Sequence, residues 1–143
     1  MPIRSAGSTR KESTFEDRKP ALGFHKLIAF VATRDPTRAK AFYRDTLGLQ
    51  LVSEDQFALV FDVAGAMLRV TTVKDVARAQ YTVLGWQVQD IVQSVKDLQR
   101  AGVSFERYAE TTQDELGIWK SPSGARVAWF KDPDDNTLSI TQF

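Results

Sequence analysis

The chemistry open to this chain is limited first by the side chains that it lacks. It contains no cysteine and a single histidine, His25, among 143 residues. A thiolate nucleophile and a cysteine zinc site are therefore excluded, and a Ser-His-Asp triad could form only around His25. The adjacent acids Asp114 and Glu115 do not suit a catalytic dyad, because neighbouring residues of a strand point to opposite faces. We expect these two acids in a solvated loop.

A run of acids near the end of the chain, Asp132-Pro133-Asp134-Asp135-Asn136, is the other concentration of possible ligands. It lacks the spaced acids, the central glycine and the terminal glutamate of a calcium-binding EF-hand loop. We interpret it as a tight turn between two strands, in which Asp135 tolerates a positive φ.

The elements that must position these side chains begin with a short apolar run, HKLIAFVA from His25, which is typical of a buried strand. Asp35 and Pro36 then favour the start of a helix, and Gly48 favours its end. Three strands are predicted to follow, in LQLVSE, FALVFD and AMLRVTTV, with a hairpin between the last two.

The same order of elements then repeats. YTVLGWQV is a strand, Asp90 caps a second helix and Gly102 ends it, and the later strand candidates are VSFERY, LGIWKS, ARVAWFK and TLSITQF. Superposing Asp35 on Asp90 brings Gly48 to within one residue of Gly102. The sequence therefore predicts two βαβββ modules.

These modules predict an α+β fold in which eight strands form an incomplete barrel around a cleft, with the helices outside. We expect one domain over residues 21–143, with modules at about 23–75 and 80–143. Residues 1–20 are basic and polar and have little to bury. They predict an N-terminal arm, either a disordered tail or an arm that docks on a partner subunit.

The charge balance argues against polyanionic partners. Nineteen basic and eighteen acidic residues give a net charge of +1, so no strong field favours nucleic acid or an anionic membrane. No apolar run approaches the ~20 residues of a membrane helix, and the chain does not begin with the apolar core of a secretion signal. We therefore expect a cytoplasmic protein that binds neither nucleic acid nor membrane.

Two segments, FVATRDPTRAKAFYRDTLGL and GARVAWFKDPDDNTLSI, together with the repeat, resemble the vicinal oxygen chelate superfamily. That superfamily includes glyoxalase I, bleomycin resistance proteins and extradiol dioxygenases. The resemblance covers roughly residues 23–143. It implies the fold but not the reaction, since this architecture serves isomerases, dioxygenases, thiol transferases and metal-free drug binders.

The resemblance allows the metal ligands of the family to be compared position by position. The histidine and glutamate positions correspond here to Ile28, Arg69, Leu84 and Ser139, none of which suits a divalent ion. His25 lies three residues before Ile28, and strand alternation puts it on the opposite face. We therefore expect no bound metal and no cofactor.

Alternate residues of a strand share a face, so the residues two places from these positions should point to the same side as they do. Together these residues predict a ligand cavity. Tryptophans would form its flat apolar walls, and Arg69 would add a forked cation suited to a carboxylate, a phosphate or a polarised carbonyl. The alternatives are an arginine that pairs with an internal acid or faces water, and tryptophans that only pack the core. The residues predicted to bind the ligand are Ile28, Phe30, Arg69, Leu84, Trp86, Val127, Trp129 and Ser139.

The leading interpretation is metal-independent binding of a small, partly planar organic molecule, anionic ligands included, as in sequestration or resistance. The alternative is an enzyme of this fold, of lyase or isomerase type, that uses atypical metal ligands or Arg69 as an electrophilic anchor. A third interpretation is an interaction module without a real cavity. The sequence leaves open whether a reaction is catalysed. The resemblance and the exposed sheet edges of short modules both favour a homodimer.

Overall fold

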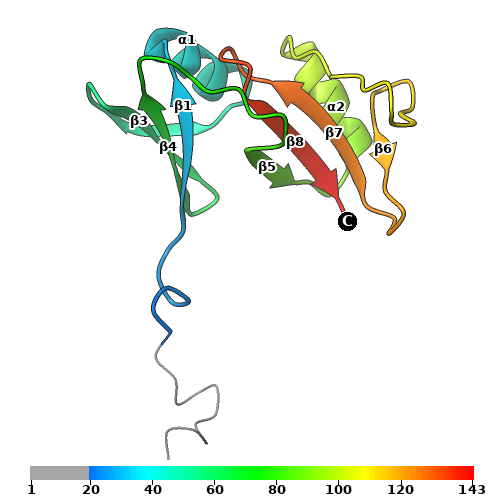
Figure 1. Ribbon diagram of the computed structural model, residues 1–143, viewed down its shortest axis with the longest axis horizontal. Helices are drawn as coiled ribbons and strands as arrows, with labels where there is room; N and C mark the ends of the chain where they lie inside the picture. The colour runs from blue at the N-terminus through cyan, green and yellow to red at the C-terminus, as the bar shows by residue number, and fades with distance from the viewer. Residues whose placement is uncertain (1–19) are drawn as a thin grey trace, which may run out of the picture.

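The computed structural model describes residues 20–143. The predicted arm, residues 1–20, lies outside this part of the chain except for Pro20. The chain folds into two successive modules, each a four-stranded sheet with helix on one side, and Figure 1 shows the two sheets next to each other. The predicted α+β fold of two βαβββ modules is confirmed, and its sheets stay open and do not close into a barrel.

The first module follows the predicted order. The Asp35 carboxylate accepts a hydrogen bond from the Arg38 N–H at 3.2 Å and caps the helix, whose first residue is Pro36. The helix continues as a π-helix and is followed by Gly48 at φ 75°. Its elements are β1 (Ile28–Thr33), α1 (Pro36–Lys40), η3 (Ala41–Thr46), β2 (Gln50–Glu54), β3 (Ala58–Val63) and β4 (Ala66–Thr72).

The second module departs from prediction between its helix and its last hairpin. VSFERY, expected as a strand, contributes only an isolated bridge between Phe105 and Phe130, and the expected strand LGIWKS is reduced to two residues. The reason is that side chains hold the intervening loop, so the backbone needs no ladder there. The elements are β5 (Leu84–Gln87), α2 (Ile91–Arg100), β6 (Trp119–Lys120), β7 (Arg126–Lys131) and β8 (Thr137–Gln142).

The two sheets have equivalent topologies. The strand order is β1-β4-β3-β2 in the first and β5-β8-β7-β6 in the second, and the first strand of each module runs parallel to its last. The helices cover one face of their sheets, and the core lies between helix and sheet, around Tyr43, Phe61, Ile91 and Phe130. Each sheet therefore has a second face that no helix of residues 20–143 covers.

The acidic turn joins the two modules. The buried Asp132 carboxylate accepts the Tyr43 hydroxyl at 2.6 Å and the Asn136 amide at 2.8 Å. Asp134 accepts the Thr33 hydroxyl at 2.6 Å, and the Asn136 amide also donates to a carbonyl of β1 at 2.9 Å. Burial raises the pKa of Tyr43, and the negative charge of Asp132 raises it further, so the hydroxyl stays a donor. The interpretation as a turn is confirmed, and its acids hold the first module.

Candidate functional site

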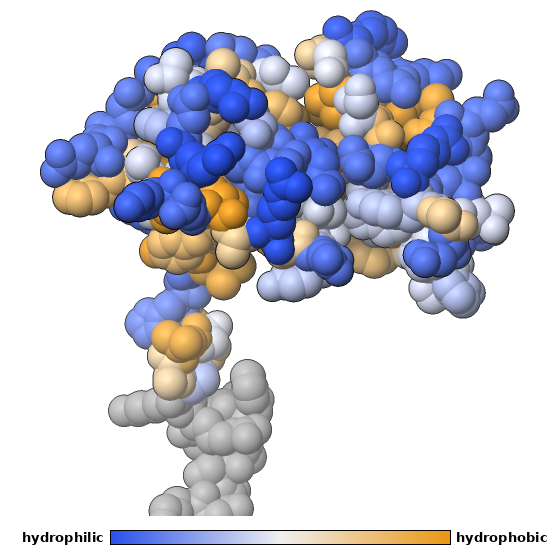
Figure 2. All heavy atoms as spheres, turned by 45° about the horizontal axis from the view of Figure 1, so that its top comes forward, coloured by the Kyte–Doolittle hydropathy of each residue, from blue (hydrophilic) through white to orange (hydrophobic). Residues whose placement is uncertain are grey.

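The helix-free face of the first sheet carries three of the predicted ligand residues. Phe30 lies opposite Arg69 on β4, and Ile28 lies opposite Met67, so the parity predicted for this sheet is confirmed. Phe30 is 61 % exposed and Ile28 43 % exposed. Figure 2 shows apolar atoms gathered on this module near the point where the chain enters β1.

Arg69 is half-buried on this face. Among the described residues no carboxylate lies within 4.0 Å of its guanidinium, so the alternative of an arginine paired with an internal acid is not observed there; Glu54 on β2 binds Lys40 at 2.7 Å. A cavity of about 560 Å³ on this side of the sheet is lined by Ile28 and Met67 among others but not by Arg69. The anchoring role of Arg69 stays a prediction.

The predicted placement of Leu84 and Trp86 is wrong. Gly85, not Leu84, lies opposite Ser139 on β8, and Ser139 in turn lies opposite Trp129 on β7. Trp86 lies opposite Ile140 and packs on the helix side of the sheet. The ligand position that the resemblance gives on this strand was wrong by one residue. A shift of one residue moves every side chain of a strand to the other face of the sheet.

The helix-free face of the second sheet, here called the open face, carries an aromatic cluster. Val127 and Trp129 lie on it, as predicted, together with Trp119 of β6. The ring of Trp129 lies 5.5 Å from that of Tyr108, edge to face, and 5.9 Å from that of Trp119. Trp129 and Tyr108 line a cavity of about 510 Å³, together with Arg78, Ala79, Gln80, Tyr81, Thr82, Glu110, Thr111, Lys131, Asp135 and Thr137.

Gln113 fixes the loop that carries Tyr108. Its amide nitrogen donates to the carbonyls of Glu106 and Gly117 at 2.9 and 2.8 Å, and its oxygen accepts the Tyr108 N–H at 2.8 Å. The Glu106 N–H also binds the carbonyl of Trp129 at 2.8 Å. The loop is therefore bonded to β7 at the residue that forms the cavity wall, and the aromatic cluster is preorganised.

The cavity combines this wall with two cations and two acids. Arg78 is paired with Asp135 at 2.7 Å. Lys131 is half-buried and has no carboxylate of residues 20–143 within 4.0 Å. Burial raises the pKa of Tyr108, and Glu106 raises it further, so Tyr108 presents a neutral hydroxyl. The cavity can therefore stack a planar group on Trp129 and offer the Lys131 ammonium to an anion.

Sequence reasoning missed most of this lining. Lys131 could have been found, because it follows Trp129 by two residues on the same strand and alternation gives both one face. Tyr81 and Tyr108 lie in loops, for which strand periodicity gives no signal. Ser139 is on the open face but is buried beside Gly85 and does not line the cavity.

The residues at the metal positions of the resemblance do not fit a divalent ion. Ile28, Arg69, Gly85 and Ser139 offer one weak hydroxyl ligand and one cation. Within the part of the chain that the structure describes, no three histidine or acidic side chains gather as a metal site. No chemical step is therefore assigned to a metal. No helix within residues 20–143 is long and apolar enough to span a membrane.

Comparison with known families gives one match over most of the chain. Residues 25–140 match the model of the Glyoxalase/Bleomycin resistance protein/Dioxygenase superfamily. A comparison with curated protein sequences finds no match.

Solved structures share the fold at low sequence identity. Lactoylglutathione lyase from Agrobacterium tumefaciens is 16 % identical, with a TM-score of 0.65 and coverage of 87 % of this chain and 95 % of that chain. A superfamily member from Sphaerobacter thermophilus is 22 % identical, with a TM-score of 0.65 and coverage of 83 % and 97 %. A fosfomycin resistance protein from Listeria monocytogenes is 13 % identical, with a TM-score of 0.63 and coverage of 82 % and 91 %.

Proposed function

The chain belongs to the Glyoxalase/Bleomycin resistance protein/Dioxygenase superfamily, and from this premise we propose that it binds a small, planar organic anion on its open face without a metal ion. The aromatic cluster around Trp129, with Lys131 beside it, carries this proposal. Sequestration of a harmful compound is the role that follows. It agrees with the resistance function named for one structural neighbour, while another neighbour is a lyase.

Size and charge both support a planar anion. A cavity of about 510 Å³ lies within the ~300–1,000 Å³ of typical small-molecule sites. The paired charges of Arg78 and Asp135 cancel, so among the described residues that line the cavity Lys131 is the cation left to balance an anion. Glu110 at the rim is exposed and therefore well screened by water.

A titration with 2-naphthoate, followed by tryptophan fluorescence, tests the proposal. Lys131→Met keeps the aliphatic stem and removes the charge, so it should weaken binding about ten- to a hundredfold, the loss expected for a charge-assisted contact. Lys120→Met is the matched control, because Lys120 is exposed on β6 and does not line the cavity. Equal affinities for the two variants would refute the role of Lys131.

The same titration decides the sequence-based prediction for Arg69. If Arg69 anchors the anion, Arg69→Ala should weaken 2-naphthoate binding while Lys131→Met has little effect. The reverse result would leave the first sheet without a part in anion binding.

Metal independence has its own measurement. Ile28, Arg69, Gly85 and Ser139 offer no converging donor set, so the protein should carry well below one zinc, nickel, iron or manganese ion per chain after mild purification. Elemental analysis checks this value. About one ion per chain would support the alternative of an enzyme with atypical ligands.

A homodimer and a cytoplasmic location complete the proposal. The exposed apolar side chains of Phe30 and Ile28 form a face that nothing in the described chain covers, and a second copy would bury it. Cell fractionation tests the location, and recovery of the protein outside the cytoplasmic fraction would count against it.

A further inference from the structure

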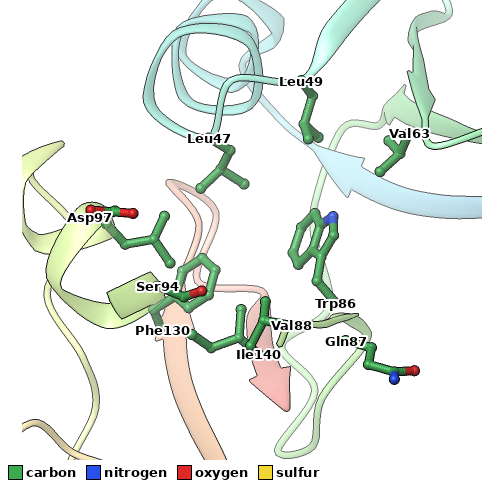
Figure 3. A pocket seen from close by; sticks show the side chains of 11 residues that line it. Leu47, Leu49, Val63, Trp86, Gln87, Val88, Ser94, Asp97, Phe130 and Ile140 are labelled. Carbon is green, nitrogen blue, oxygen red and sulfur yellow. The ribbon is translucent and has the colours of Figure 1, made fainter. Parts of the chain in front are cut away.

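A third cavity lies on the helix side of the junction between the modules, away from the open face. Its volume is about 340 Å³. We call it the junction cavity. Figure 3 shows side chains from both modules pointing into it around Trp86. It is lined by Leu47, Leu49, Val63, Trp86, Gln87, Val88, Ser94, Asp97, Leu98, Phe130 and Ile140.

The internal repeat explains why the cavity exists. Superposing Asp35 on Asp90, the two helix caps, puts Leu98 at the place of Tyr43 and Ser94 at the place of Ala39. Tyr43 and Ala39 are fully buried, whereas their counterparts on α2 face the cavity. The second module therefore has smaller or polar side chains where the first has a packed ring.

The hairpin turns of the two modules also differ in how much of the junction they fill. Five residues connect β7 and β8, and Asp132 among them accepts the Tyr43 hydroxyl. Two residues, Ala64 and Gly65, connect β3 and β4, and Val63 before them reaches the junction cavity. One of the two equivalent junctions is therefore filled by protein, and the other is left open.

The walls of the cavity are fixed by packing and backbone bonds. The rings of Trp86 and Phe130 lie 6.5 Å apart at an interplanar angle of 19°. The N–H groups of Leu47 and Leu49 bind carbonyls of η3 at 2.9 and 3.0 Å, on either side of Gly48. These contacts lie within the protein, so the cavity does not need a guest to keep its shape, and its mainly apolar walls suit an apolar guest.

Charge at the cavity is neutralised within the protein. Asp97 is the single acid among the described lining residues, and it accepts hydrogen bonds from Gln93 at 2.9 Å and from Arg100 at 2.6 Å, on the solvent side of α2. Within residues 20–143, no lysine or arginine lines the cavity. An ion would therefore lose its hydration without finding a partner, and a neutral guest is favoured over an anion or a cation.

We propose that the junction cavity is a second binding site, which takes a neutral aromatic molecule of one or two rings, with Ser94 as its polar contact. Benzene fills an apolar cavity of ~150 Å³, so about 340 Å³ admits a fused pair of rings. The site does not depend on the function proposed for the open face, and the two differ in the charge of the ligand, an anion on the open face and a neutral molecule in the junction cavity.

The test uses 2-naphthol, which is neutral at pH 7, and 2-naphthoate, which has the same rings and a negative charge. The chain has three tryptophans, so an NMR spectrum resolves three indole N–H signals, and Trp86→Phe identifies the one from Trp86. Addition of 2-naphthol to the full chain should shift the Trp86 signal first, and 2-naphthoate should shift it at least tenfold less readily.

Cavity-filling variants complete the test. Leu98→Tyr gives α2 the residue that the first helix carries at the equivalent place, and Ser94→Leu fills the cavity with a smaller change if that variant does not fold. Each should weaken 2-naphthol binding at least tenfold, whereas Gln99→Tyr, an exposed neighbour on α2, should not. No shift of the Trp86 signal at saturating 2-naphthol, or full binding by both filled variants, would overturn the proposal. So would a Trp86 shift produced by dilution alone, which would make a second copy of the chain the occupant.

Discussion

Tyr43 is the residue on which the joining of the two modules depends most directly. Its ring packs among the core aromatics, while its hydroxyl donates to Asp132 at 2.6 Å across the junction. Both groups are buried. A carboxylate is costly to bury without a hydrogen-bond donor. The bond to Tyr43 offsets this cost and at the same time joins the two modules.

Tyr43→Phe should lower the free energy of unfolding by about 1 to 3 kcal/mol, because a buried carboxylate loses one donor while the ring packing is kept. Urea denaturation measures this change. Tyr81→Phe is the control, because Tyr81 is 70 % exposed and its change should cost little. Equal stability of the two variants would contradict a structural role for the Tyr43–Asp132 bond.

The difference between wild type and Tyr43→Phe should also depend on pH. Folding raises the pKa of Tyr43 above its ordinary value of 10.0, so above this pH the unfolded chain loses a proton that the folded chain retains. The stabilisation is therefore complete below pH 10 and declines as the pH rises further. Denaturation of both proteins at pH 7, 9 and 11 checks this sign. A difference that grows between pH 9 and pH 11 would contradict it.

The two helices and most of the strands followed from the sequence because their signals are local. Asp35 and Asp90 cap the helices as predicted, and Gly48 and Gly102 adopt positive φ at their ends. The sequence did not predict which face of β5 packs against the helix. Leu84 and Trp86 are apolar on one face and glycine lies on the other, so nothing local in YTVLGWQV distinguishes the two faces. The wall formed by Tyr108 could not be predicted either, because Gln113 positions it through bonds within a loop.

Gly85 lies opposite Ser139 on the open face, and the lack of a side chain there leaves room for the Ser139 hydroxyl. A Cβ at this position would lie 2.8 Å from the Ser139 hydroxyl oxygen. Gly85→Ala should therefore destabilise the fold by about 1 kcal/mol. Ser139→Ala removes the oxygen, so the double variant should recover most of this loss, and a double-mutant cycle in urea measures the coupling. Additive effects would mean that glycine is required there for another reason.

The whole molecule is two half-covered sheets rather than one closed body. Within the part of the chain that the structure describes, each sheet buries its helix side and leaves a face of large apolar or aromatic residues open, Phe30 and Ile28 on the first and the Trp129 cluster on the second. Monomeric proteins seldom leave broad apolar patches in water. The proposed homodimer would explain this pattern, because the first sheet of each copy would have its apolar face covered by the partner.

Phe30→Glu should convert the proposed homodimer into a monomer. A charge in the middle of a buried apolar face has no partner there, and its desolvation costs several kcal/mol, enough to weaken association more than a hundredfold. Light scattering during gel filtration at micromolar concentration measures the mass. Phe57→Glu is the matched control, because Phe57 is 63 % exposed at the turn between β2 and β3, away from this face. If the wild-type chain is a monomer, or if Phe30→Glu remains dimeric while folded, the apolar face of the first sheet is not an interface between copies. A ligand or another protein must then cover it.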